Sequence, residues 1–257
     1  MIYIVIALTA LFASFLTFFS GFGLGTILVP VFAIFYPVPI ALALTAVVHL
    51  LNNIFKITLV FKNINWAIAL KFGLPSFFAA LFGSWLLNQI SNYDLVIHVY
   101  KLFNHSFQIT LLNLIVGVLI ILFSIIEISK KISNLSFNQN YLILGGLLSG
   151  FFGGLSGHQG AIRSAFLFQL NLDKKVFIAT GVFVACLVDV ARLFFYNQNI
   201  TMSNNLNYSL ISVAVISAFC GAYFGNKLFT KTSVTFFKWF VALFMFIMGL
   251  LIISGVV

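Results

Sequence analysis

The chain has 257 residues, of which 62% are hydrophobic and only 7% are charged, and its mean hydropathy is +1.17. A soluble domain carries about 25% charged residues because its surface must be solvated, so this composition excludes an ordinary soluble protein. The net charge of +9 does not indicate a nucleic-acid partner, because the basic residues lie at the ends of apolar runs, where membrane proteins carry topology signals. The expected solvent is the lipid bilayer.

The first half of the chain contains five apolar runs, and a membrane-spanning helix needs about 20 apolar residues. Helical runs are expected over residues 2–20, 26–36, 39–61, 66–87 and 109–128. The first two are separated by a glycine-rich break at 21–25. The mixed stretch 88–105 carries apolar residues at roughly helical spacing, so we expect a helix that lies in the membrane interface.

The second half repeats this order of elements. Helical runs are expected over residues 141–152, 161–172, 176–196, 206–226 and 236–256, and the first two flank a second glycine-rich break at 153–160. Short motifs recur in the same order: Ala80–Leu86 resembles Ala222–Leu228, and Gly117–Ile121 resembles Gly249–Ile253. We therefore predict an all-α integral membrane protein of two repeats, residues 1–128 and 141–257, joined by a cytoplasmic linker over 129–140.

The positions of Lys and Arg predict the orientation of these segments. Lys130-Lys131, Lys174-Lys175 and the link 226–235 are basic and are expected in the cytoplasm, whereas the link 197–205 has no basic residue and is expected outside. The segment 141–172 must then enter the membrane and return as a hairpin of two short helices. If the first half does the same, the two repeats have inverted topology, with about eight full spans plus two glycine-broken hairpin elements, or up to ten passes. Both termini are then expected outside.

The two glycine breaks are the first candidate for function. A helix that is broken at membrane depth leaves backbone groups that must face protein, water or ligand. The helix that follows presents a positive dipole end, which favours an anion. Gly23, Gly25, Thr26, Gly157 and Gly160 are therefore candidate substrate-binding residues. The alternative is that these glycines only permit close helix packing.

Three polar side chains sit on or just after the second break. His158, Gln159 and Arg163 are candidate substrate contacts. A buried guanidinium needs a counter-charge, and an oxyanion would supply it through bidentate hydrogen bonds. An internal partner such as Asp189, or extension of Arg163 to the interface, is the alternative.

A polar stripe runs along the span 39–61. Thr45, His49, Asn52, Asn53 and Lys56 fall on one helical face, which must point at a cavity or the bundle interior. Asn52 and Asn53 are candidate substrate contacts. His49 is a candidate proton carrier, because histidine titrates near neutral pH, and a hydrogen-bonded structural histidine is the alternative.

The equivalent span, 176–196, carries Asp189 and Arg192. Their i,i+3 spacing allows a pair within the helix, which we interpret either as a structural ion pair or as a gate or proton site. Cys186 and Cys220 show no metal-ligand spacing, and no catalytic motif appears. We expect no metal, no cofactor and no catalytic residue.

The stretches at the breaks and at the start of the polar stripe resemble the TauE/SafE family of sulfite exporters. They are Gly21–Thr26 with Pro30, Ala43–Thr45, Leu51–Asn53 and Ser149–Gly157. The likeness extends over nearly the whole chain. It implies a multi-pass permease of the bacterial cytoplasmic (inner) membrane for sulfur-containing anions, with proton coupling a common proposal for such proteins. The family's glycine-rich stretches map onto Gly23, Gly25, Gly157 and Gly160.

The sequence thus favours a secondary transporter rather than an enzyme. It would move a small anion such as sulfite, sulfoacetate or thiosulfate by alternating access, linked to protons. Two other hypotheses stay open: an intramembrane enzyme that uses His158 and Asp189 as acid and base, and a passive anion channel. The expected partners are the anion, protons and lipid, and a homodimer is an open alternative.

Overall fold

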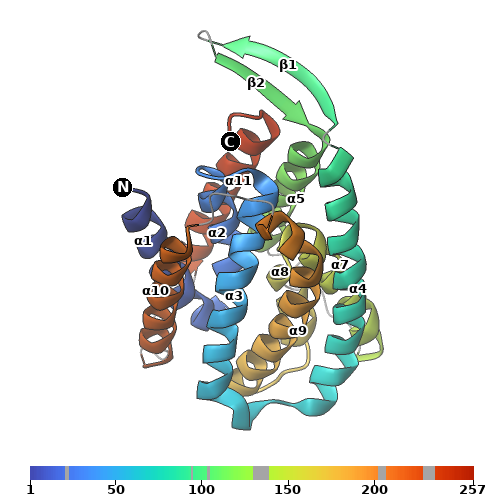
Figure 1. Ribbon diagram of the computed structural model, residues 1–257. Coiled ribbons are helices and arrows are strands. Elements are labelled where there is room, and N and C mark those ends of the chain that lie inside the picture. The colour runs from blue at the N-terminus through green and yellow to red at the C-terminus, as the bar shows by residue number, and fades with distance from the viewer. Residues whose placement is uncertain (21–22, 94, 103–104, 130–138, 202–206, 228–234) are drawn as a thin grey trace.

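The computed structural model describes residues 1–20, 23–93, 95–102, 105–129, 139–201, 207–227 and 235–257 (Figure 1). Apolar sequence forms helices here because every backbone polar group in lipid must be paired internally. The first half contains α1 (Ile2–Ser20), α2 (Leu24–Ala33), α3 (Val38–Val60), the 3-10 turn η1 (Phe61–Asn63), α4 (Trp66–Tyr93), β1 (Val96–Leu102), β2 (His105–Thr110) and α5 (Leu111–Ile128).

The second half has the same order without the strands. It contains the 3-10 turn η2 (Gln139–Tyr141), α7 (Leu142–Ser156), α8 (Gly160–Phe168), α9 (Lys174–Thr201), α10 (Tyr208–Lys227) and α11 (Thr235–Ile253). The protein is an all-α membrane protein with one added β-hairpin. Most of the expected linker, residues 130–138, lies outside the described residues.

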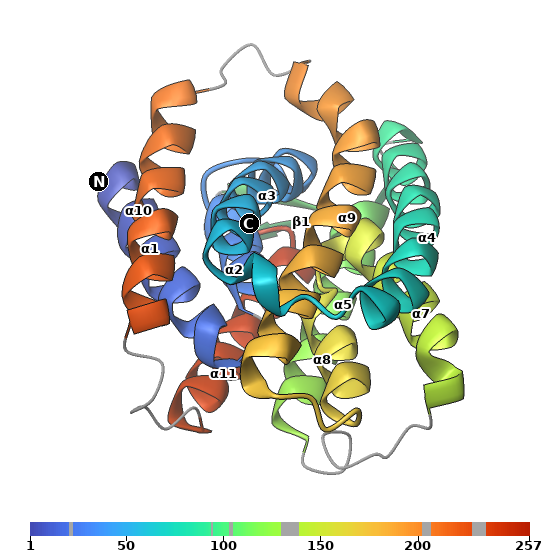
Figure 2. The same cartoon turned by 90° about the horizontal axis from the view of Figure 1, so that it is seen from below.

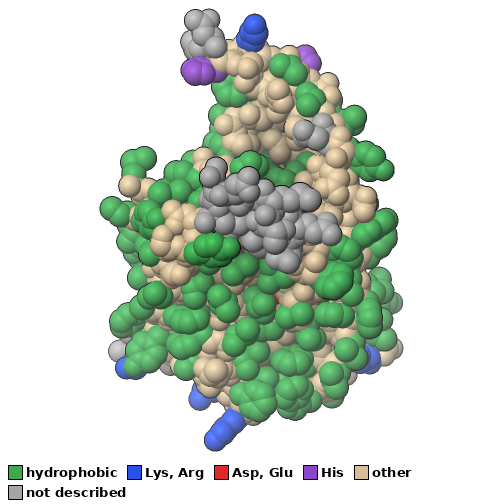
Figure 3. Space-filling view, in the orientation of Figure 1, with side chains coloured by type: hydrophobic (Ala, Val, Ile, Leu, Met, Phe, Trp, Pro, Cys, Tyr) green, Lys and Arg blue, Asp and Glu red, His purple; other side chains and the backbone are tan. Residues whose placement is uncertain are grey.

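Both halves of the chain contain helices that could span a membrane. Among the described residues, five helical segments are long and apolar enough to cross a bilayer: Val38–Asn63, Trp66–Tyr93, Leu111–Ile128, Lys174–Tyr196 and Tyr208–Lys227. Shorter apolar helices cover Ile2–Thr17, Leu24–Ala33 and Trp239–Ile253. Hydrophobic side chains cover the body of the molecule in the view of Figure 3, and Lys or Arg side chains gather at its lower end.

The helices pack in pairs. In Figures 1 and 2, α1 lies beside α10 at one flank and α4 beside α7 at the other, while α3 and α9 pack against each other between them and α5 packs on α11. The α4–α7 pair needs glycine, since a Cβ on Gly150 would clash with the Ser76 backbone carbonyl. On the other flank, a Cβ on Gly221 would clash with the carbonyl of Leu11. These close contacts hold the two helices of each flanking pair together.

The expected interfacial helix over 88–105 is wrong. Instead, α4 continues to Tyr93, and Val96–Leu102 pairs with His105–Thr110 as an antiparallel hairpin that projects from the end of the molecule where the C-terminus lies (Figure 1). Tyr100 faces Phe107 across the hairpin, with ring centroids 5.4 Å apart, and its hydroxyl donates to the Ser254 carbonyl at 2.8 Å. Cross-strand aromatic pairs and β-branched residues stabilise strands here more than the helical spacing of apolar residues stabilises a helix.

Candidate functional site

The two glycine breaks meet at the centre of the protein. Gly157 ends α7 in the left-handed conformation, with φ +80°, and Gly23 precedes α2 with φ +137°. A Cβ added to Gly25 would lie 3.4 Å from the Gly157 carbonyl oxygen and 3.6 Å from the His49 ring. Thr26 caps this turn through its hydroxyl, which donates to the Gly23 carbonyl at 2.9 Å. Segments more than a hundred residues apart therefore converge on α3. Residues 21–22 of the first break lie outside the described residues.

Asp189 organises a buried polar network between three helices. Its Oδ2 lies 2.6 Å from His49 Nδ1 and accepts from Asn53 Nδ2 at 3.2 Å, both on α3. Its Oδ1 accepts from Gln159 Nε2, at the start of α8, at 3.3 Å. The same Oδ1 accepts from Arg192 Nε at 3.0 Å, and Arg192 Nη2 lies 2.9 Å away. The i,i+3 pair expected from sequence is present, and it is one part of a larger network.

Every member of this network is buried. Asp189 and Arg192 have no exposed surface, and His49 is 7% exposed. Because an isolated charge at this depth is strongly unfavourable, the ion pair must be held by several hydrogen bonds at once. Arg192 also reaches the second break, since a Cβ on Gly157 would lie 2.8 Å from its Nη1. Among the described residues, this Nη1 has no hydrogen-bond partner.

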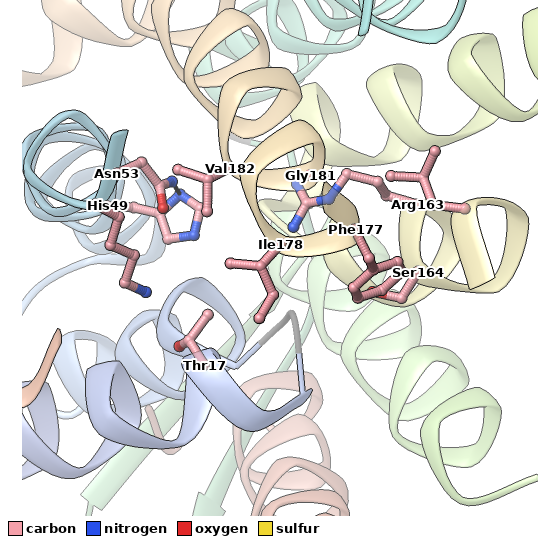
Figure 4. Close-up of a pocket in the computed structure, with 11 residues that line it drawn as sticks. Thr17, His49, Asn53, Arg163, Ser164, Phe177, Ile178, Gly181 and Val182 are labelled. Carbon is pink, nitrogen blue, oxygen red and sulfur yellow. Dashed lines mark hydrogen bonds between the residues drawn. The ribbon is translucent and has the colours of Figure 1, made fainter. Parts of the chain in front are cut away.

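A pocket opens beside the network (Figure 4). Its polar lining comes from α1, α3 and α8, and its apolar lining comes mainly from α9. The lining residues are Thr17, His49, Asn53, Lys56, Arg163, Ser164, Leu167, Phe177, Ile178, Gly181 and Val182. In Figure 4 the guanidinium of Arg163 points towards Gly181 and the side chains from α3 approach from the opposite side. The pocket therefore brings polar side chains together with an apolar wall inside an apolar bundle.

The charges around this pocket are mostly positive. Lys56 and Arg163 both line it, and they are 1% and 4% exposed. Arg163 Nη1 donates to Gln159 Oε1 at 3.3 Å, and Gln159 in turn contacts Asp189. The chain has four acidic residues in all, and Asp189 is the one that lies in this network. Two buried basic side chains beside hydroxyl and amide groups form an environment suited to an anion.

Some sequence-predicted residues lie elsewhere. The His158 ring stacks on Phe123 of α5 with centroids 5.6 Å apart, and its Nδ1 lies 2.8 Å from the Ser156 carbonyl oxygen, so it does not line the pocket. Asn52 hydrogen-bonds with Ser14 Oγ of α1 at 3.1 Å. Gly160 is the first residue of α8. Of the ten residues expected to bind substrate, Asn53 and Arg163 line the pocket.

Three polar lining residues were not among the candidates from sequence. Lys56 belongs to the predicted polar stripe, and its spacing from Asn53 gave a signal that it faces the same pocket. Ser164 follows Arg163 directly in α8. Thr17 lies in α1 one turn before the first break, and a lone threonine in an apolar run gives little signal. Within the described ranges, no group of three or more His, Cys, Asp or Glu side chains could hold a metal ion.

Apolar helices around a buried polar centre define a polytopic membrane protein with an internal site. The sequence matches the family model of the sulfite exporter TauE/SafE over residues 6–252, and the chain therefore belongs to this family. No curated protein and no solved structure matches it. Membership confirms the resemblance drawn from the glycine breaks, and it makes the protein a membrane transporter of the class that moves sulfur-containing anions.

Proposed function

We propose that the protein is a secondary transporter that moves a small sulfur-containing anion, such as sulfite, sulfoacetate or thiosulfate, across a bacterial inner membrane. The observation that carries this proposal is the pocket lined by Lys56 and Arg163 beside the meeting point of two broken helices. An anion there would interact favourably with these two buried basic side chains. Helix breaks at membrane depth are a recurrent feature of transporter sites.

In this proposal the two halves are inverted repeats, residues 1–128 and 141–257. If α1 to α5 correspond in order to α7 to α11, the α4–α7 and α10–α1 contacts are equivalent. The α3–α9 and α5–α11 contacts are then each equivalent to themselves. Any pseudo-two-fold relation between the halves requires this pattern. When its axis lies in the membrane plane the repeats are inverted, and such repeats support alternating access.

We place the lower end of Figure 1 in the cytoplasm. The α3–α4 link with Lys62, the start of α9 with Lys174 and Lys175, and the end of α10 with Lys227 all lie there. Both termini and the β-hairpin lie towards the other end (Figure 1). Short cytoplasmic links carry an excess of Lys and Arg, which supports this orientation.

The roles of the site residues follow from their positions. Arg163 and Lys56 bind the anion, and Asn53 and the hydroxyls of Thr17 and Ser164 supply further hydrogen bonds. The backbone at Gly23, Gly25, Thr26, Gly157 and Gly160 allows the breaks to approach the site closely. Asn52 and His158 support the surrounding helices through Ser14 and Phe123.

The Asp189 network is the proposed gate. The His49–Asp189 contact joins α3 of the first half to α9 of the second half, and Arg192 joins the same carboxylate to the second break. If His49 gains or loses a proton, the strength of this contact changes, because only the protonated ring forms an ion pair with the carboxylate. Proton transfer at His49 would therefore favour one arrangement of the halves over the other.

Flux into proteoliposomes tests the proposal. Labelled sulfite is supplied outside, a pH gradient is imposed, and accumulation is compared between wild type and Arg163→Ala, with Lys62→Ala as a control on an exposed lysine. We expect accumulation that depends on the gradient and on Arg163. Rapid flux that ignores the gradient would identify a channel. Absence of flux for sulfite, sulfoacetate and thiosulfate would refute the proposal.

A further inference from the structure

Gln159 lies between the pocket and the Asp189 network, and its side-chain amide contacts both. Its Oε1 accepts from Arg163 Nη1 at 3.3 Å, and its Nε2 donates to Asp189 Oδ1 at 3.3 Å. Gln159 is 2% exposed and is not one of the residues that line the pocket. Both ends of the amide are therefore engaged by protein groups.

The surroundings of Gln159 hold this amide in position. Its backbone carbonyl accepts from Ser149 Oγ at 3.0 Å and from the Arg163 backbone N–H at 3.1 Å. A Cβ on Gly153 of α7 would lie 2.7 Å from the Gln159 Cβ, so the glycine makes room for the side chain. We call the path of hydrogen bonds from Arg163 through the Gln159 amide to Asp189 the relay. Gln159 anchors it on α7 and on α8, the two arms of the second broken element.

The acceptor of this relay is also the gate carboxylate. Asp189 Oδ1 accepts hydrogen bonds from the Gln159 amide and the Arg192 guanidinium. Oδ2 accepts one from Asn53 and contacts His49 Nδ1. A shift of the Arg163 guanidinium towards a bound anion would change the hydrogen bond that it gives to Gln159. The amide would then change its hydrogen bond to Oδ1, because its two ends are parts of one rigid planar group.

We infer that Gln159 is a positioning residue that couples occupancy of the anion pocket to the Asp189 gate, without contacting the anion. This inference rests on the proposed transport function and adds to it the residue that links binding to gating. The ionisable groups near the relay include Arg163 from α8 and Asp189, Arg192 and Cys186 from α9, with His49 and Lys56 from α3 beyond them. Coupling between sites is a free energy, so it can be lost while binding and passage remain.

The test separates uphill from downhill transport. In proteoliposomes with a pH gradient of about one unit, a carrier that moves one proton per anion accumulates sulfite about tenfold. We expect Gln159→Met, which fills similar volume without hydrogen bonds, to abolish accumulation while downhill sulfite exchange stays within about threefold of wild type. Gln159→Asn, which is too short to reach both partners at once, should accumulate less than wild type. The matched control is Gln169→Met, at the other end of α8.

A double-mutant cycle of Gln159→Asn, which leaves measurable accumulation, with Asp189→Asn completes the test. If Gln159 acts through Asp189, the two substitutions together should reduce accumulation no more than the stronger one alone, within about twofold. Wild-type accumulation by Gln159→Met would overturn the inference. Equal loss of uphill and downhill transport in both Gln159 variants would also overturn it, because this result would indicate a structural or substrate-contacting role. Absence of sulfite flux in wild type would instead refute the proposed transport function, and the two failures are distinguishable.

Discussion

Substitution of Asp189 by asparagine tests the buried network directly, and it requires no knowledge of the substrate. Asparagine keeps the size of the side chain and removes its charge. The contacts that change are those with His49 at 2.6 Å, with Arg192 Nε at 3.0 Å and with Arg192 Nη2 at 2.9 Å. Arg192 is fully buried, so its charge has no solvent to compensate for the loss of the carboxylate.

The expected cost is large because one partner of a buried pair remains charged. Removing one member of such a pair destabilises a protein by about 3–5 kcal/mol. For chains of this size, each kcal/mol lowers the midpoint of thermal unfolding by about 2–4 °C, so we expect a decrease of about 6–20 °C for Asp189→Asn. Asp173→Asn is the matched control, because Asp173 is exposed at the start of α9, and it should change the midpoint little.

The assay is thermal unfolding of the purified protein in detergent, followed by tryptophan fluorescence and by the fraction that stays monodisperse. The double variant Asp189→Asn with Arg192→Met should recover at least half of the lost stability, since it removes the uncompensated cation along with the carboxylate. The reasoning is refuted if Asp189→Asn unfolds at the wild-type temperature. It is also refuted if the double variant is less stable than the single one.

Three further outcomes are expected. Arg163→Ala should raise the KM for sulfite uptake about tenfold to a hundredfold, because a charge-assisted hydrogen bond contributes about 1.5–3 kcal/mol, and an unchanged KM would remove Arg163 from the site. Gly150→Ala should lower the unfolding temperature because the added Cβ pushes α7 away from α4. Gly181→Ala should not, because a Cβ there would lie 3.5 Å from its nearest atom, and equal stability of the two variants would contradict the packing described. In intact cells, a membrane-impermeant thiol reagent should label Lys101→Cys on the hairpin and spare Lys62→Cys on the α3–α4 link, and the reverse pattern would invert the proposed orientation.

Much of the helical architecture could be predicted from the sequence because lipid imposes strict requirements. An apolar run of sufficient length must be helical, and the breaks at Gly23 and Gly157 interrupt two such runs at corresponding places. The polar stripe from Thr45 to Lys56 had to face inwards, and all five of its members are buried. These features depend on local residue type and spacing, which a single sequence records.

The partners of the site residues could not be predicted in the same way. His49 and Asp189 are separated by 140 positions, and no periodicity indicates which buried groups on different helices meet. His158 and Gln159 are adjacent in the same break, yet Gln159 contacts Asp189 whereas His158 stacks on Phe123. The hairpin after Tyr93 differs from the interfacial helix that the sequence predicts, because short apolar stretches of β-branched and aromatic residues fit both periods.

Solute counterflow of sulfite distinguishes a carrier with one alternately exposed anion site from a channel. Vesicles containing the wild-type protein are loaded with unlabelled sulfite and diluted into a trace of labelled sulfite. We expect a transient overshoot of label inside the vesicles, which sulfoacetate or thiosulfate suppresses and which is smaller in Arg163→Ala. Sulfite entry without an overshoot, or an overshoot that is unchanged in Arg163→Ala, would contradict this expectation.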